Sequence, residues 1–230
     1  MIECLNLSYL VGNGLVMQIK TLNKLQDLIY EDFIWRKKEL IDLKQVIYST
    51  NNPIYIRSGF ALLCAHFEGF IKQVANYYLV YVSSQNIPIS ELKCNFAAIY
   101  SANKLKPCKD SEKISVYNKF LSSFLSDYNS SNFKIKYSIE NPIIKTGGNP
   151  SSTIFEEIIY TLGLDFSIYE TKRNYIDTDL LSNRHKIVHG ERFYLKKEEF
   201  NQTLKNVIDI MELFNDQVFV AAQKKYYLKT

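Results

Sequence analysis

The sequence is poor in the residues that interrupt helices. Among 230 residues there are only 8 glycines and 5 prolines, which argues against an all-β sandwich with many turns and favours long helices. None of the 4 cysteines forms a CxxC pair and no signal-peptide pattern precedes them, so we expect reduced thiols in a cytoplasmic protein. No uncharged apolar run reaches the roughly 18 residues that a transmembrane helix needs, so we expect no membrane association.

The overall composition is that of an ordinary globular protein. Hydrophobic residues make up 47% of the chain and charged residues 23%, which allows a sizeable core. The formal net charge of +4 is compatible with an RNA partner. Helical patterning begins at Met17, so we interpret residues 1–16 as a tail or an N-terminal extension and residues 17–230 as a single domain.

Hydrophobic periodicity predicts three long helices. Apolar residues three and four positions apart indicate amphipathic helices over 17–47 and 196–225. The segment 54–83 is apolar around most of its surface, which predicts a central helix. Pro53 suits the first turn of that helix. Between residues 84 and 128 we expect short helices at 90–102 and 112–126, separated by a loop around Pro107.

The next segment changes in character. Phe133, Ile135, Tyr137 and Ile139 alternate with polar residues, so we predict an insertion at about 130–152 that carries at most a short hairpin. Helical signals then return. A capping box formed by Thr153 and Glu156 is expected to start one helix, which ends at Gly163. Asp177 is expected to be the N-cap of another, which stops at Gly190. The fold class is therefore an all-α four-helix bundle with additional short helices and a loop or hairpin insertion.

The stretch SNRHKIVHGE, residues 182–191, holds two of the three histidines in the chain. On a helix, His185 and His189 lie on one face, whereas Arg184 lies about 140° around the axis from His189. A long guanidinium can still reach toward an imidazole in the last turn, where a positive charge is favoured. One interpretation is RNA cleavage, in which the ribose 2′-OH is the nucleophile, histidine moves protons and arginine holds the phosphate.

Two other interpretations of this stretch remain open. The first is a polar helix end in which His189 caps carbonyl groups. The second is a metal site at His185 and His189, which would need Glu191 or the distant His66 as a third ligand. We expect no metal and no cofactor. In the central helix, His66 is interpreted as a buried histidine with satisfied partners. We expect Glu68 to pair with Arg57 or another basic residue, or to line a cleft.

Several motifs, in this order, resemble those of the HEPN superfamily, and in particular its MAE-type bacterial proteins. They are WRKKEL (35–40), AHFEGFIKQVANYYLVYV (65–82), IFEEIIYTLGLD (154–165) and RHKIVHGE (184–191). Arg184 and His189 are separated by four residues, within the usual family spacing. The sequence departs from the family at Phe67, where tryptophan is expected, and at His185, where asparagine is commoner.

This resemblance implies a metal-independent endoribonuclease, often a toxin of a toxin–antitoxin pair or an antiviral defence effector. Arg184 and His189 would be catalytic, His185 would support them, and Lys186 and Glu68 would contact substrate. The implied partners are RNA, a second copy in a homodimer, and a nucleotidyltransferase-like antitoxin or another defence protein. The alternative is an inactive HEPN-like module that binds RNA or a protein partner.

Overall fold

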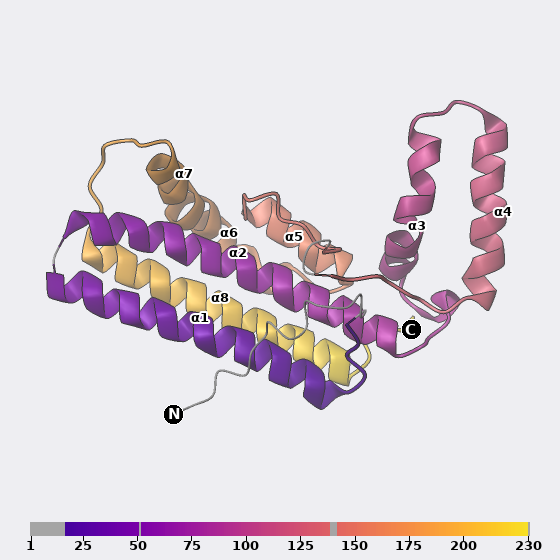
Figure 1. The fold of residues 1–230 in the computed structure, drawn as a ribbon, viewed down its shortest axis with the longest axis horizontal. Helices are drawn as coiled ribbons and strands as arrows, with labels where there is room; N and C mark the ends of the chain where they lie inside the picture. The colour runs from indigo at the N-terminus through magenta and orange to yellow at the C-terminus, as the bar shows by residue number, and fades with distance from the viewer. Residues whose placement is uncertain (1–16, 51, 139–141, 230) are drawn as a thin grey trace.

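Three long helices form the body of the protein. The computed structural model describes residues 17–50, 52–138 and 142–229. Helices α1 (Leu22–Thr50), α2 (Pro53–Ser84) and α8 (Lys197–Gln223) pack on one another along their lengths (Figure 1). They supply most of one continuous hydrophobic core. The predicted all-α bundle is confirmed, while the expected extension at 1–16 lies outside the described residues.

Helix α2 lies at the centre of the bundle, as its apolar surface predicted. Its buried residues lie on several sides of the helix, because α1, α8 and the segment before α8 all pack against it. The predicted start is also confirmed. Pro53 occupies the first turn, and the side chain of Asn52 accepts a hydrogen bond from the Ile54 amide at 3.0 Å. An N-cap of this kind satisfies one of the free amides of the first turn.

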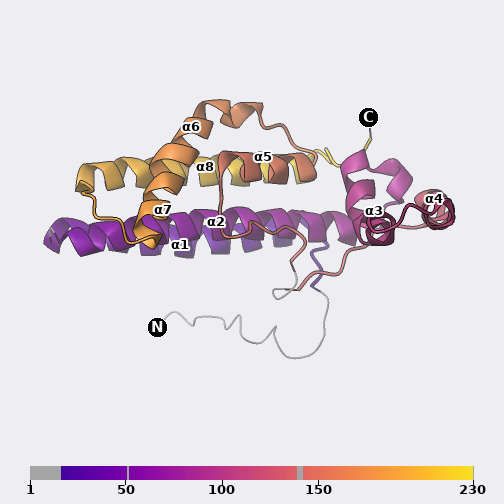
Figure 2. The ribbon, with the colours of Figure 1, turned by 90° about the horizontal axis from the view of Figure 1, so that it is seen from above.

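Helices α3 (Cys94–Lys109) and α4 (Ile114–Ser130) form a hairpin that projects from the C-terminal end of α2 (Figures 1 and 2). The loop predicted around Pro107 is wrong, because this proline lies in the last turn of α3. A proline there removes only one hydrogen bond near a helix end. The Tyr117 hydroxyl also holds that end by donating to the Cys108 carbonyl at 3.2 Å.

The segment after α4 crosses α2 as extended chain, and the predicted strand is wrong for residues 133–138. Phe133 and Tyr137 are buried, which explains the alternating pattern, but no strand lies beside them in the part of the chain that is described. Side chains of α2 replace the missing strand. Ser83 accepts a hydrogen bond from the Ile135 amide at 3.1 Å, and Asn76 accepts from the amides of residues 143 and 144. Ile139 lies outside the described residues.

The fourth side of the bundle consists of short helical segments. Helix α5 (Ser152–Thr161) is followed by a 3-10 turn, η3 (Ser167–Lys172), then α6 (Arg173–Tyr175), a π-helix, η4 (Ile176–Ser182), and α7 (Asn183–Val188). Figure 2 shows α5 beside α8, with α6 and α7 descending toward α2. These segments cover the face of α2 that α1 leaves open, and they carry the Arg184–His189 motif.

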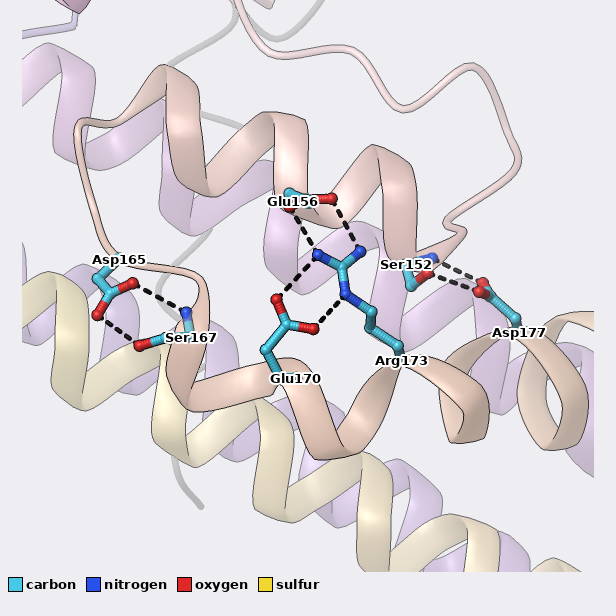
Figure 3. A network of polar contacts seen from close by, with 7 residues as sticks. All are labelled: Ser152, Glu156, Asp165, Ser167, Glu170, Arg173 and Asp177. Carbon is cyan, nitrogen blue, oxygen red and sulfur yellow. Dashed lines mark hydrogen bonds and ion pairs between the residues drawn. The ribbon is translucent and has the colours of Figure 1, made fainter.

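A network of charged side chains joins α5 to the segment that follows it (Figure 3). The Arg173 guanidinium donates to Glu170 at 2.6 Å and to Glu156 at 2.8 Å. The capping box predicted at residues 153 and 156 is therefore wrong, since Glu156 binds Arg173. The N-cap of α5 is Ser151, which accepts from the Ile154 amide at 3.2 Å.

Asp177 has a different role from the one expected. It lies inside a continuous run of helical turns and so is not the N-cap of the helix that follows. Its carboxylate instead accepts from both the amide, at 2.7 Å, and the hydroxyl, at 2.5 Å, of Ser152 in the first turn of α5 (Figure 3). A carboxylate at a helix N-terminus satisfies free amides and suits the helix dipole. Asp177 thus ties the π-helix to α5.

Candidate active site

The motif residues lie on α7, the last helical turns before α8. The helix ends as predicted at Gly190, whose φ of 71° is accessible to glycine with little strain. The Gly190 amide donates to the Ile187 carbonyl and the Glu191 amide to the Lys186 carbonyl, the two bonds of a Schellman motif. His189 is the C-cap residue. Its position is therefore determined by a well-formed helix end.

A π-helix leads directly into α7. Ile176 and Leu180 anchor this segment in the core, and Asp177 attaches it to α5. A π-helix has a wider turn than an α-helix, so it changes the direction in which later side chains project. Such turns occur frequently at functional sites. Sequence reasoning missed this feature, because a single period of 3.6 residues was assumed.

The structure brings the two histidines together. The rings of His185 and His189 are 4.2 Å apart between centroids, with an angle of 53° between their planes. Both side chains are exposed. Contact between residues four apart follows from helix geometry. No group of three or more His, Cys, Asp or Glu side chains able to hold a metal occurs in the described ranges. The histidine pair is therefore accessible to a ligand but lacks a third metal ligand there.

Arg184 points elsewhere, toward α2. Burial raises the pKa of the Cys64 thiol on α2 to about 12, and the nearby charges of Arg184 and Glu68 lower and raise it by smaller amounts. Arg184 is half-buried, and across residues 17–50, 52–138 and 142–229 its guanidinium forms no hydrogen bond or ion pair. Arg184 therefore lies close enough to α2 for its charge to act on Cys64, as that of Glu68 does. On α7 it lies about 140° around the helix axis from His189.

Glu68 does not pair with Arg57, so this one of the alternatives expected for Glu68 is wrong. The Glu68 carboxylate accepts a hydrogen bond from the Thr146 hydroxyl, in the segment before α5. Arg57 instead binds the chain that follows the motif. It donates to the Glu191 carbonyl at 2.9 Å, and its guanidinium lies 5.0 Å from the centre of the Phe193 ring. Sequence reasoning did not identify this role, because backbone carbonyl partners leave no signal in a sequence.

Lys186 shares the same aromatic ring. Its ammonium lies 5.5 Å from the centre of the Phe193 ring, so two cations, Lys186 and Arg57, lie near one half-buried aromatic ring. His66 is separate from this group. It is buried against α1, with its Nε2 atom 2.8 Å from a Glu39 oxygen, and burial lowers its pKa. His66 therefore belongs to the packing of α1 on α2.

A groove of about 630 Å³ runs along α2 beside α7. Its walls are mainly apolar, with Arg57 as the charged residue, and Ile187 is the contribution of α7. The neighbouring Val188 is 63% exposed. The lining residues are Ile54, Arg57, Ser58, Ala61, Leu62, Ala65 and Ile187. An open apolar surface therefore adjoins the motif.

The family model described as RiboL-PSP-HEPN matches residues 31–219, which include the motif, all of α2 and most of α1 and α8. The chain belongs to the HEPN superfamily. HEPN domains are all-α and are typically ribonucleases or RNA-binding modules, so this chain carries a domain of that kind. No curated protein and no solved structure matches this HEPN chain. None of its described helices is long and apolar enough to cross a membrane.

Proposed function

We propose that this HEPN protein is a metal-independent endoribonuclease. The observation that carries the proposal is the state of Arg184. Arg36 and Arg173 are each paired with a carboxylate, whereas the half-buried Arg184 has no such partner in the described part of the chain. A guanidinium that pairs with no carboxylate in the described part of the chain, on the same short helix as the two exposed imidazoles, suits a bound phosphate.

In the proposed reaction the RNA supplies its own nucleophile. The ribose 2′-oxygen attacks the adjacent phosphorus and loses its proton to a base. The bond to the 5′-oxygen breaks, and that oxygen takes up a proton. The products are a 2′,3′-cyclic phosphate and a 5′-hydroxyl. His189 transfers one of these protons, Arg184 stabilises the charge on the phosphate, and His185 orients its neighbour. Lys186 and Glu68 are proposed to contact the RNA beside the scissile phosphate.

A homodimer is part of the proposal, since Arg184 and His189 lie on different sides of α7. Two copies that meet along the α2 groove would bring both motifs into one cleft. The apolar lining of the groove and the exposed Val188 support such an interface. In the cell we propose a toxin or antiviral defence effector in the cytoplasm, restrained by a nucleotidyltransferase-like antitoxin or another defence partner.

Cleavage of total cellular RNA in the presence of EDTA tests the proposal. We expect the wild-type protein to cleave and to leave cyclic phosphate ends. His189→Ala should lose about 100- to 10,000-fold in rate, and Arg184→Ala should lose activity comparably. Arg192→Ala removes an exposed arginine nearby and is the matched control. Undiminished cleavage by the first two variants would refute the assignment. RNA binding without cleavage by the wild type would identify the inactive binding module instead.

A further inference from the structure

Another groove lies between the C-terminal half of α1 and the N-terminal half of α8. Its volume is about 510 Å³, within the range of roughly 300 to 1,000 Å³ that ligand sites occupy. We name it the Tyr48 groove, because it is lined by Tyr48, which is 41% exposed. The lining residues are Ile41, Lys44, Gln45, Tyr48, Asn201, Leu204, Lys205 and Ile208. The groove therefore offers an aromatic ring that a ligand can reach.

Three lysines lie at the Tyr48 groove. The ammonium of Lys44 lies 6.0 Å from the centre of the Tyr48 ring, and that of Lys197 lies 5.4 Å from it. Lys205 lines the groove from α8. Both ring contacts are near the outer limit of about 6 Å for a cation–π interaction. These flexible side chains are therefore held weakly and can turn to another ligand.

The positive charge of these lysines is not neutralised within the described part of the chain. None of the three forms an ion pair there, and no carboxylate lines the groove. The same two helices do form an ion pair further along, where the Lys37 ammonium lies 2.8 Å from a Glu212 oxygen. A carboxylate thus meets a lysine between α1 and α8 outside the groove but not within it, so the groove suits an anion.

The combination of groups in the groove favours one kind of anion. An exposed ring on which a base can stack, beside cations that can hold phosphates, is the usual arrangement for sequence-tolerant binding of a single strand. An acidic peptide would use the cations but has no regular flat group for the ring. A second copy of the protein related by a twofold axis would place lysines against the same lysines. Single-stranded RNA is therefore the occupant that the groove fits best.

The Tyr48 groove lies at the same end of the bundle as the motif (Figure 1). From α7 the chain runs through residues 190–196 directly to the start of α8, where Lys197 lies. This connection also carries Tyr194, which is 82% exposed. A strand that leaves the motif can therefore follow the connection to the groove.

We propose that the Tyr48 groove binds single-stranded RNA, with one base stacked on Tyr48 and phosphates held by Lys44, Lys197 and Lys205. The last two lysines are separated by about 12 Å along α8, so they contact different phosphates. The bound strand is the one that is cut at the motif. That last statement rests on the proposed ribonuclease function, whereas the binding itself does not.

Fluorescence anisotropy of a labelled, unstructured single-stranded RNA tests the groove. The probe carries 2′-O-methyl groups, so the 2′-oxygen cannot attack and binding is measured without cleavage. Tyr48→Ala should weaken binding about 5- to 150-fold, as the loss of one stacked base does. Tyr48→Phe keeps the ring and should bind like the wild type. Tyr30→Ala is the matched control, since Tyr30 is 61% exposed on α1 but lies about 27 Å away along the helix.

The salt dependence of binding tests the lysines. Lys44→Gln combined with Lys205→Gln removes two phosphate contacts. The slope of log affinity against log salt concentration should become shallower by about 1.4, because each contact with a single strand contributes about 0.7. Lys24→Gln combined with Lys119→Gln removes the same charge from exposed positions on α1 and α4 and should keep the wild-type slope.

Equal affinity of Tyr48→Ala and the wild type would overturn the proposal, and so would an equally shallow slope in the two double variants. A polyglutamate peptide that binds more tightly than the RNA and depends on Tyr48 would also overturn it, since the groove would then suit an acidic protein. Cleavage of unmodified RNA in EDTA separates the two proposals. Binding through Tyr48 without cleavage would refute the ribonuclease alone, and cleavage by a protein whose binding ignores Tyr48 would refute the groove alone.

Discussion

Arg57 is predicted to hold the chain that follows the motif. Its guanidinium donates to the Glu191 carbonyl at 2.9 Å and lies over the Phe193 ring. The carbonyl of Phe193, two residues further on, is 3.5 Å from the same nitrogen, at the limit of a hydrogen bond. Arg57→Ala removes all of these contacts, so the chain just after the Schellman motif loses its attachment to α2.

The magnitude follows from the contacts that are lost. A hydrogen bond from a charged donor contributes about 1.5 to 3 kcal/mol when it is well formed, and an exposed cation–π contact about 0.5 to 1 kcal/mol. Arg57 is only half-buried, so solvent reduces both values. We expect a net loss of about 1 to 2 kcal/mol, which corresponds to a roughly 5- to 30-fold larger population of the detached segment.

Amide hydrogen exchange measures this population directly. The Glu191 amide donates to the Lys186 carbonyl and should exchange roughly 5- to 30-fold faster in Arg57→Ala. Arg57→Lys keeps the charge but loses the planar fork, so its effect should be intermediate. Arg192→Ala is the control, since Arg192 is exposed and lies in the same segment. Equal exchange at Glu191 in Arg57→Ala and the wild type would refute the anchoring role.

Three further predictions concern stability. Gly59→Ala should destabilise the fold by about 1 to 3 kcal/mol, because a Cβ there meets rigid core side chains at 2.9 Å. Gly69→Ala should lower the free energy of unfolding by less, because the nearest atom there is at the end of the flexible Arg36 side chain. Equal urea midpoints for these two variants would contradict this difference in packing around the two glycines. Burial raises the pKa values of Cys64 and Tyr77 to about 12 in the folded state. The unfolded chain therefore loses these protons at a lower pH than the folded chain does, so the urea midpoint should decrease as the pH rises above about 9. A constant midpoint would exclude this linkage. Asp177→Asn should lower thermal stability by about 1 to 2 kcal/mol through loss of the charged cap on α5; an unchanged melting temperature would show that the cap is dispensable.

The parts of the fold that follow from periodicity were predictable. Helices α1, α2 and α8 each bury a regular apolar pattern, so their existence and order could be inferred from spacing alone. The start of α2 at Pro53 and the glycine ends at residues 163 and 190 also followed from local chemistry. These features depend on residues close together in the chain, and such signals are the strongest in a single sequence.

The errors arose where distant residues decide the structure. The alternation at Phe133 and Tyr137 comes from packing an extended chain on α2. The side chains of Ser83 and Asn76, some 50 to 70 residues earlier, accept backbone hydrogen bonds in place of a partner strand. Asp177 likewise caps a helix 25 residues before it. Within the site, the motif could be located from the sequence, but the direction of Arg184 could not, since the π-helix before it changes the phase of the helix.

The position of α8 in the chain has a consequence for synthesis. Helices α1 and α2 are complete at Ser84, but α8, which packs on both, begins only at Lys197. During translation the apolar faces of α1 and α2 that pack on α8 therefore remain exposed to solvent while more than a hundred residues are added. The motif is translated just before α8, so its surroundings on α2 become stable only when α8 has left the ribosome. Nascent chains would expose aggregation-prone surface during that interval.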